Sequence, residues 1–329
     1  MQRKIRFSAV AVVFGSCADR YVLEGYSPKK SFEEMMESAK KVADLEGIEL
    51  VGGWHLTSRN AREVVKKVED FGLRVSVIIP ELWSSAKWGL GSFAARDKKI
   101  RQDAIDEVKR AMDLARETGC NIVAPWFGQD GYDYSFQANY IKAWDLITEG
   151  LVECADHLPD VKIAVEYKIK EPRTHCFIGT VGKVILLTKE VGRDNVGVTL
   201  DVGHALEGYE NMAESVALLK RFGNKLFHLH LNDNYRLWDD DMIPASVHTI
   251  EMLELLYWLD KTGYDGWYSL DIFPYREDGQ KAATEGIEWI KALFKIIDKI
   301  GKEKIEQVIE QGDATSASAL LRKALTENL

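Results

Sequence analysis

RFSAVAVVF, residues 6–14, is the stretch that decides the fold. Because it follows a basic start and contains small residues, it resembles both the apolar core of a signal peptide and the first strand of a sheet. We predict a strand, because seven further apolar runs of strand length follow, at 48–54, 74–80, 121–127, 161–167, 196–200, 226–232 and 266–273. Long helical patterns separate these runs, and only with 6–14 included do the strands number eight.

Eight strands that alternate with amphipathic helices are typical of an α/β fold, the (β/α)₈ TIM barrel. Gly119, Gly192 and Gly263 follow helical patterns and are predicted to end those helices. We expect residues 1–300 to form one catalytic barrel domain and residues 301–329 to form a C-terminal helical extension. The extension is either a solvated tail or a helix that packs on a neighbouring subunit.

Composition narrows the class of protein. The chain has 329 residues, of which 46% are hydrophobic, so it can bury a large core. Its net charge of −9 argues against a nucleic-acid partner or an anionic membrane surface, and no apolar run approaches the length of a membrane span. The four cysteines are scattered without a CxxC motif, which favours a reduced, cytoplasmic setting: Cys17, Cys120, Cys154 and Cys176.

Ionisable residues fall at four consecutive strand ends. These are Glu166, Asp201, His230 and Asp271. Chemistry in a barrel of this kind takes place at the carboxyl ends of the strands. Each carboxylate alone could cap the following helix. Together, within apolar runs, they are costly to bury unless a cation binds them. One imidazole and three carboxylates suit Mn²⁺ first, with Mg²⁺ or Co²⁺ as alternatives.

The stretch HLHLNDNYRLWDDDM, residues 228–242, combines two histidines with three consecutive aspartates. His228 and His230 lie on one face of a strand, because side chains alternate. We expect His230 to bind metal and His228 to be a deeper, hydrogen-bonded residue. Asp239–Asp241 are either a solvated loop or, with His204, ligands of a second cation.

Aromatic residues gather at the same strand ends, and we select Trp54 and Trp126 as substrate contacts. Aromatic rings can stack on the C–H faces of a sugar, although ordinary core filling is the alternative. His55, in GWHLT, either touches substrate or forms a structural hydrogen bond.

The motifs VEYKIKEP, LDVGH, FHLHLNDN, WDDDM and YSLDIFPYRED, within 161–273, resemble the xylose isomerase-like superfamily of TIM barrels. The pattern is most similar to the L-rhamnose isomerase type, in Glu166-x-Lys168 and in Asp201-x-Gly-His204. One extra residue separates His230 from the aspartate run. The resemblance implies a first metal held by Glu166, Asp201, His230 and Asp271. It implies a second metal, near the substrate oxygens, held by His204, Asp239 and Asp241.

This resemblance implies a divalent-metal-dependent isomerase that interconverts an aldose and a ketose. Glu166, Lys168 and Asp271 would be catalytic, with Lys168 on a substrate oxygen, and His204 would also contact substrate. The alternative is a D-tagatose 3-epimerase-like enzyme, which transfers a proton at C3. Arg236 favours that alternative as a substrate ligand, but its second glutamate would have to be Glu171, because strand 8 carries the shorter Asp271.

Two further alternatives are remote. A related DNA-repair nuclease would need a basic face and an Asp-x-His where Asp239–Asp241 stand. A non-catalytic metal- or sugar-binding barrel would keep the metal without turnover. The expected partner is a free monosaccharide, because no phosphate-binding glycine loop is evident, and we expect a homodimer or homotetramer.

Overall fold

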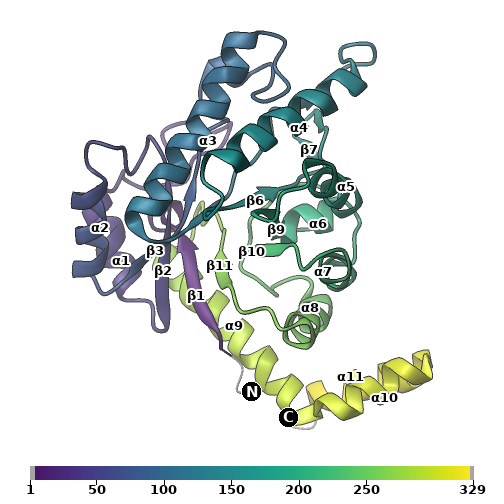
Figure 1. Ribbon diagram of the computed structural model, residues 1–329. Coiled ribbons are helices and arrows are strands. Elements are labelled where there is room, and N and C mark those ends of the chain that lie inside the picture. Colours follow the sequence, from purple (N-terminus) through teal and green to yellow (C-terminus); the bar gives the residue numbers. More distant parts are fainter. Residues whose placement is uncertain (1–3, 327–329) are drawn as a thin grey trace.

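The computed structural model describes residues 4–326 as a closed parallel barrel surrounded by helices (Figure 1). The strands are hydrogen-bonded in the order β1-β11-β10-β9-β6-β4-β3-β2. Their bounds are β1 (Arg6–Val10), β2 (Leu45–Val51), β3 (Arg74–Ile79), β4 (Ile122–Val123), β6 (Lys162–Glu166), β9 (Val196–Asp201), β10 (Leu226–Leu231) and β11 (Trp267–Leu270). The predicted TIM barrel, with its eight strands, is confirmed.

Two strand boundaries differ from the prediction. β1 ends at Val10, and the rest of the apolar run, Ala11–Phe14, forms the 3₁₀ helix η1. Ala11, Val13 and Phe14 are buried against the helices packed around η1, so they are apolar for a reason other than strand pairing. A short apolar run cannot distinguish these two cases by periodicity. β2 covers Leu45–Val51, three residues earlier than the predicted 48–54.

Helices cover the outside of the barrel (Figure 1). They are α1 (Phe32–Lys40), α2 (Ala61–Asp70), α3 (Lys98–Thr118), α4 (Tyr140–His157), α5 (Val181–Val191), α6 (Val202–Glu207), α7 (Met212–Arg221), α8 (Thr249–Thr262) and α9 (Gly279–Ile300). Gly119, Gly192 and Gly263 end α3, α5 and α8 with φ of 75°, 62° and 73°. This left-handed conformation costs a glycine little, which confirms the predicted helix ends.

The C-terminal segment is helical. After α9, the helices α10 (Lys302–Gln311) and α11 (Ala314–Thr326) project from the barrel (Figure 1). Residues 1–3 and 327–329, which the two predicted ranges include, lie outside the described residues. Within residues 4–326, no helix combines the length and the hydropathy of a membrane span. All four cysteines are free thiols.

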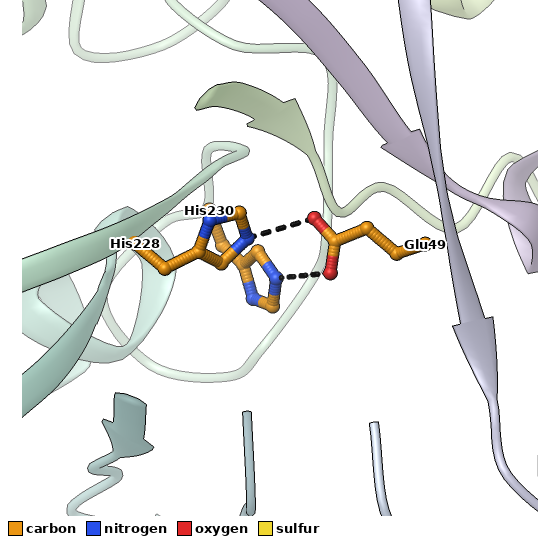
Figure 2. A group of neighbouring side chains, drawn as sticks. All are labelled: Glu49, His228 and His230. Carbon is orange, nitrogen blue, oxygen red and sulfur yellow. Dashed lines mark hydrogen bonds and ion pairs between the residues drawn. The ribbon is translucent and has the colours of Figure 1, made fainter. Parts of the chain in front are cut away.

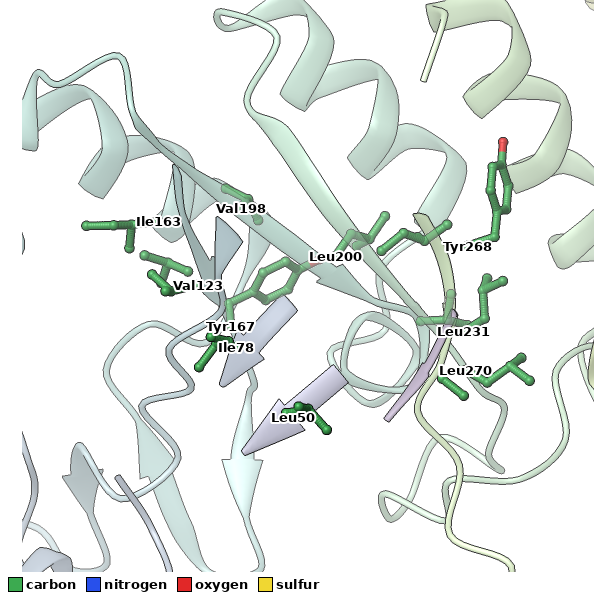
Figure 3. Close-up of a cluster of buried hydrophobic side chains, with 14 of the residues drawn as sticks. Leu50, Ile78, Val123, Ile163, Tyr167, Val198, Leu200, Leu231, Tyr268 and Leu270 are labelled. Atoms are coloured by element: carbon green, nitrogen blue, oxygen red, sulfur yellow. The ribbon is translucent and has the colours of Figure 1, made fainter. Parts of the chain in front are cut away.

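The main core lies between the barrel and its helices. Figure 3 shows part of it, including Leu50, Ile78 and Leu200. Each such side chain contributes about 1.5–3 kcal/mol by leaving water. A second cluster (Val10, Val51, Val77, Ile79 and Ala124) comes from β1, β3 and β2 and from the residue after β4. Other side chains inside the barrel are polar and buried, among them Glu49, His228 and Ser269.

A small antiparallel sheet lies beside the barrel mouth. It consists of β5 (Gly131–Tyr132), β7 (Lys170–Glu171) and β8 (Thr174–Cys176), in the order β5-β8-β7. β7 begins two residues after Lys168, so the sheet fixes the segment that follows β6. The loop after β4 and the loop after β6 are therefore tied together next to the site.

Candidate metal centre

The four predicted ligands of the first metal meet at the carboxyl ends of neighbouring strands. Glu166 ends β6, Asp201 ends β9, His230 lies near the end of β10, and Asp271 directly follows β11. Strand register places His230 beside Asp201. One ligand atom from each of the four side chains lies within 4.8 Å of the other three. The structure therefore brings together the whole set that the sequence selected.

The orientation of His230 suits a cation. Its Nδ1 lies 3.1 Å from Asp271 Oδ2, 3.6 Å from Glu166 Oε1 and 3.7 Å from Asp201 Oδ2. This buried nitrogen has no hydrogen-bond partner among residues 4–326. A nitrogen that faces three carboxylates is stable if the ring is protonated or if a cation lies between them. The donor set and its geometry therefore fit a divalent metal.

The carboxylates of the first ligand group repel one another electrostatically. Burial, Glu166 and Asp201 together raise the pKa of Asp271 to about 7, against the opposing effect of His230. Burial also raises the pKa of Asp201. A cation bound among these oxygens would remove the repulsion, because like charges in a low-dielectric site repel strongly.

A second group shares Asp201 with the first. Asp201, His204 and Asp239 also offer ligand atoms within 4.8 Å of one another. His204 Nδ1 bonds the carbonyl oxygen of Tyr167 at 3.0 Å, so a neutral His204 points its Nε2 lone pair at Asp239 Oδ2, 3.1 Å away. That arrangement again suits a cation or a protonated ring. Asp239 is partly neutralised already, because Lys168 Nζ lies 2.7 Å from the same oxygen.

Asp241 lies beside this second group rather than within it. Its Oδ1 accepts a hydrogen bond from Asn232 Nδ2 at 3.3 Å. Burial, Asp239 and Asp271 hold its pKa well above the usual range. Gly203 makes the close packing possible, because a Cβ there would lie 2.9 Å from Asn232 Oδ1 and 3.0 Å from Asp239 Oδ1. The glycine of the Asp-x-Gly-His motif thus has a steric role.

Lys168 is buried at the cavity wall, where it forms ion pairs with Asp239 and Glu171. Its Nζ also lies 5.3 Å from the centre of the Trp126 ring. Although burial opposes the charge, Asp239 and Glu171 hold the pKa of Lys168 well above its usual range. Lys168 is therefore a fixed positive charge beside the second group of ligands.

A cavity of about 930 Å³ opens above these groups. Trp54, Trp83 and Trp126 form one wall of it, with ring centres 5.4 Å and 5.8 Å apart in edge-to-face contacts. The structure thus places the predicted contacts Trp54 and Trp126 on the wall, with Trp83 between them. This volume is within the range of small-molecule sites.

Two predicted substrate contacts do not line this cavity in the described chain. His55 Nδ1 accepts a hydrogen bond from the backbone N–H of Val51 at 2.9 Å, and burial lowers its pKa to about 4. Arg236 Nε donates to His248 Nε2 at 3.2 Å, and its guanidinium is 3.7 Å from Glu251. His55 fits the structural alternative, and Arg236 faces α8 rather than the metal ligands.

Two acidic residues of the site went unnoticed in the sequence. Glu207 lines the cavity, and its buried Oε2 has no partner among residues 4–326. Glu49, in the middle of β2, is buried and bonds both His228 and His230. The three-residue spacing of Asp201, His204 and Glu207 was the available signal for the first, and a charge within the apolar run IELV was the signal for the second.

Comparison with known proteins agrees with this arrangement. Residues 24–293 match the family described as the xylose isomerase-like TIM barrel. The chain belongs to this family. A family match of this length covers most of the barrel and both groups of candidate ligands.

Members of the xylose isomerase-like family with related sequences include the xylose isomerase of Thermus thermophilus, which is 27% identical over 226 residues. The alignment covers 67% of this chain and 58% of that protein, so the chain matches less than two thirds of its relative. A xylose isomerase of Thermus caldophilus is 26% identical over the same shares.

Solved structures with the same fold include a D-tagatose 3-epimerase-like protein, with a TM-score of 0.68 and 20% identity. That comparison covers 90% of this chain and 99% of the other. A D-psicose 3-epimerase from Clostridium cellulolyticum H10 gives a TM-score of 0.67 at 15% identity, over 88% and 99% of the two chains. At these identities the likeness establishes the fold of the xylose isomerase-like family and leaves the reaction open.

Proposed function

We propose that this chain is a divalent-metal-dependent isomerase that interconverts the aldose and ketose forms of a free monosaccharide. The observation that carries the proposal is the pair of adjacent ligand groups that share Asp201, with Lys168 beside the second. The sugar isomerases among the sequence relatives support the same reaction class. Mn²⁺ is our first choice of metal, with Mg²⁺ and Co²⁺ as alternatives, because the donors are carboxylates and imidazoles.

Each part of the site has a role in this reaction. When bound, the metals would polarise the sugar oxygens at C1 and C2. Glu166, Asp201, His230 and Asp271 would hold the first of them, and His204 and Asp239 would hold the second, with Asp241 alongside. Lys168 donates a hydrogen bond to a substrate oxygen and stabilises negative charge that develops there. Trp54 and Trp126 pack against the C–H faces of the sugar and exclude water.

The reaction moves one hydrogen between C1 and C2 and one proton between the oxygens on those carbons. The carbon-bound hydrogen travels either as a hydride or as a proton through an enediol. The aromatic wall, in which Trp83 and Trp126 are half-buried, favours the hydride, because it shields the migrating hydrogen from solvent.

A ketose 3-epimerase is the second candidate, and Glu171 is the observation that favours it. Glu171 lines the cavity, as Asp271 does, and forms an ion pair with Lys168, so a second acidic group is available there. Proton removal by one carboxylate and return by the other would invert C3. Arg236, which the sequence offered in support of this reaction, is engaged with His248 instead.

The decisive experiment incubates a panel of free aldoses and ketoses in D₂O with Mn²⁺-loaded protein, uses EDTA-treated protein as the control, and follows both by NMR. Metal-dependent aldose–ketose exchange with little deuterium at C1 or C2 would support the isomerase and identify its sugar. Inversion at C3 with deuterium incorporated there would replace it with the epimerase. Absence of any turnover by a metal-loaded protein would favour a binding function.

We further propose a homodimer or homotetramer in which the C-terminal helices contact a neighbouring subunit. Ile309 and Leu325, on α10 and α11, are 44% and 39% exposed. These helices project away from the barrel (Figure 1), where a second copy can reach them. Light scattering of the full chain and of a chain that ends at Ile300 tests this directly, and an equal number of subunits in the two would contradict it.

A further inference from the structure

Glu49 reaches across the inside of the barrel to two histidines. It lies in the middle of β2, whereas His228 and His230 lie on β10, and Figure 2 shows its carboxylate pointing at both rings. Oε1 is 2.8 Å from His228 Nε2, and Oε2 is 3.2 Å from His230 Nε2. Ser269 Oγ also donates to Oε1. All four side chains are completely buried.

These contacts determine which nitrogen of His230 faces the candidate ligands. A carboxylate only accepts hydrogen bonds, so Nε2 must carry the proton that is shared with Glu49. When His230 is neutral, its lone pair is therefore on Nδ1. Nδ1 is the atom that lies 3.1 Å from Asp271 and within 3.7 Å of Glu166 and Asp201.

We propose that Glu49 is a positioning residue that fixes the tautomer and ring orientation of His230, so that Nδ1 is presented to the metal. This inference rests on the metal-binding part of the proposed function and not on the identity of the sugar reaction. Carboxylates that accept the second N–H of a metal-bound imidazole hold the ring in place and make it a better donor.

An alternative role for Glu49, as a metal ligand itself, fits the contacts less well. Glu49, His228 and His230 do offer three ligand atoms within 4.8 Å of one another. However, His228 Nδ1 is buried and has no hydrogen-bond partner in the described part of the chain. Its other nitrogen, Nε2, is at hydrogen-bond distance from Glu49, as is that of His230. Each oxygen of Glu49 thus accepts a hydrogen bond from one imidazole, and Oε1 accepts another from Ser269, so the carboxylate is satisfied without a cation.

Only a carboxylate can serve both rings in this way. Its two oxygens accept from two imidazole N–H groups, while an amide of the same shape has one acceptor and one donor. His228 and Ser269 hold the first oxygen, which leaves the second oxygen directed at His230. Glu49 is also the one completely buried ionisable side chain contributed by β1, β2, β3 and β4, all of which are fully described.

The test compares Glu49→Gln with Ser269→Ala, because both alter the bonds of one carboxylate but only the first alters the contact with His230. Binding of Mn²⁺ is measured by titration calorimetry on the full chain, and folding is followed by circular dichroism and Tm. We expect Glu49→Gln to weaken Mn²⁺ binding about tenfold to a hundredfold. Ser269→Ala should bind Mn²⁺ within about threefold of the original chain, since it keeps the His230 contact.

A role in fold stability alone would lower Tm in both variants without this difference in affinity, and that result would overturn the inference. Nitrogen-15 NMR of the Mg²⁺-loaded protein adds a second readout, in which the original chain should show the proton of His230 on Nε2. A proton on Nδ1 would also overturn it.

If Glu49→Gln does not fold, Glu49→Asp keeps the charge and both acceptors but shortens the arm. An affinity for Mn²⁺ that falls with Glu49→Asp and not with Ser269→Ala would support the inference. Equal affinities would contradict it. If Mn²⁺ affinity falls in the Glu49 variant and not in Ser269→Ala, but the original chain isomerises no sugar, the proposed reaction is wrong and the role of Glu49 is still supported. If the original chain binds no divalent metal, both the proposed reaction and the positioning role of Glu49 are wrong.

Discussion

The two halves of the barrel differ in chemistry although they share one architecture. The strands β1 to β4 present Val10, Val51 and Ile79 to the cavity, followed by the tryptophan wall. The strands β6, β9, β10 and β11 end in or just before the ionisable ligands, of which Glu166 and His230 are examples. Glu49 is the one buried charge that crosses from the first half to the second in the described chain.

This division separates two tasks, the binding of a cation by acidic side chains and the exclusion of water by apolar ones. Acidic side chains need close neighbours and a cation to remain buried, so they gather on adjacent strands. The apolar half keeps water away from them and strengthens every electrostatic contact in the site. A sugar between the halves would meet metal ligands on one side and aromatic rings on the other. Changes in the two halves should therefore affect different measurements.

Asp271→Asn should have the largest effect on activity, because it changes a candidate ligand of the first metal in the ionisable half. Asp271 lies 3.1 Å from His230 Nδ1, and the substitution removes one of three carboxylates from the first group. We expect activity on the sugar identified by the NMR panel to fall about a thousandfold or more. Steady-state kinetics in the presence of Mn²⁺ provides the measurement.

The fold should survive this substitution. Burial, together with repulsion from Glu166 and Asp201, raises the pKa of Asp271 to about 7, so the ionised side chain does not stabilise the metal-free protein at pH 8. The Tm of the metal-free variant should therefore equal or exceed that of the original chain. A folded, metal-loaded variant that keeps more than a tenth of the activity would contradict the role of Asp271.

His204→Ala should distinguish the two groups within the ionisable half. His204 Nε2 faces Asp239, whereas the first group consists of the other strand-end residues. We expect activity to fall about a hundredfold while the affinity of the first Mn²⁺ changes by less than about threefold. Calorimetry and kinetics on the same preparation give both numbers. Equal losses in the two would indicate a single site.

The eight strands and the helix ends could be predicted from the sequence because each depends on local pattern. Apolar runs of strand length and three glycines in the left-handed conformation are local signals. The boundary of β1 could not be predicted, because Ala11, Val13 and Phe14 are buried by helices that are distant in the sequence. Long-range packing, rather than propensity, decides where that run stops being a strand.

The first group of ligands could be predicted for the same reason that the barrel could. Parallel strands bring their carboxyl ends together, so one ionisable residue per strand end was sufficient. The roles of Glu49 and His55 depend instead on which way a side chain crosses or leaves the barrel. Glu49 meets residues about 180 positions away, at sequence separations of 179 and 181. His55 turns back onto Val51 beside it. Neither orientation is encoded in strand alternation alone.

Trp83→Leu should test the aromatic half without disturbing the metal. Trp83 touches both Trp54 and Trp126, and each edge-to-face contact contributes about 0.5–1.5 kcal/mol. We expect KM to rise about tenfold, since each 1.4 kcal/mol is a factor of ten, while the affinity for Mn²⁺ stays unchanged. Trp144→Leu is the matched control, because Trp144 lies on α4 and bonds Glu190 away from the cavity. A fall in metal affinity with Trp83→Leu would show that the halves are not independent.

Glu207→Gln should have the smallest effect, because Glu207 belongs to the ionisable half but to neither group of ligands. Its buried Oε2, unpartnered among the described residues, can accept a hydrogen bond from a sugar hydroxyl. A hydrogen bond to a charged acceptor is worth about 1 kcal/mol more than one to a neutral acceptor, so KM should rise about fivefold.

Glu210→Gln is the control, because the Glu210 carboxylate accepts hydrogen bonds from Tyr167 Oη and the Val181 N–H, both at 2.7 Å. That control should lower Tm and leave KM unchanged, since its partners are protein groups. If Glu207→Gln lowers Tm and leaves KM unchanged instead, the free oxygen serves the fold, and the sugar is bound by the metals, Lys168 and the tryptophan wall alone.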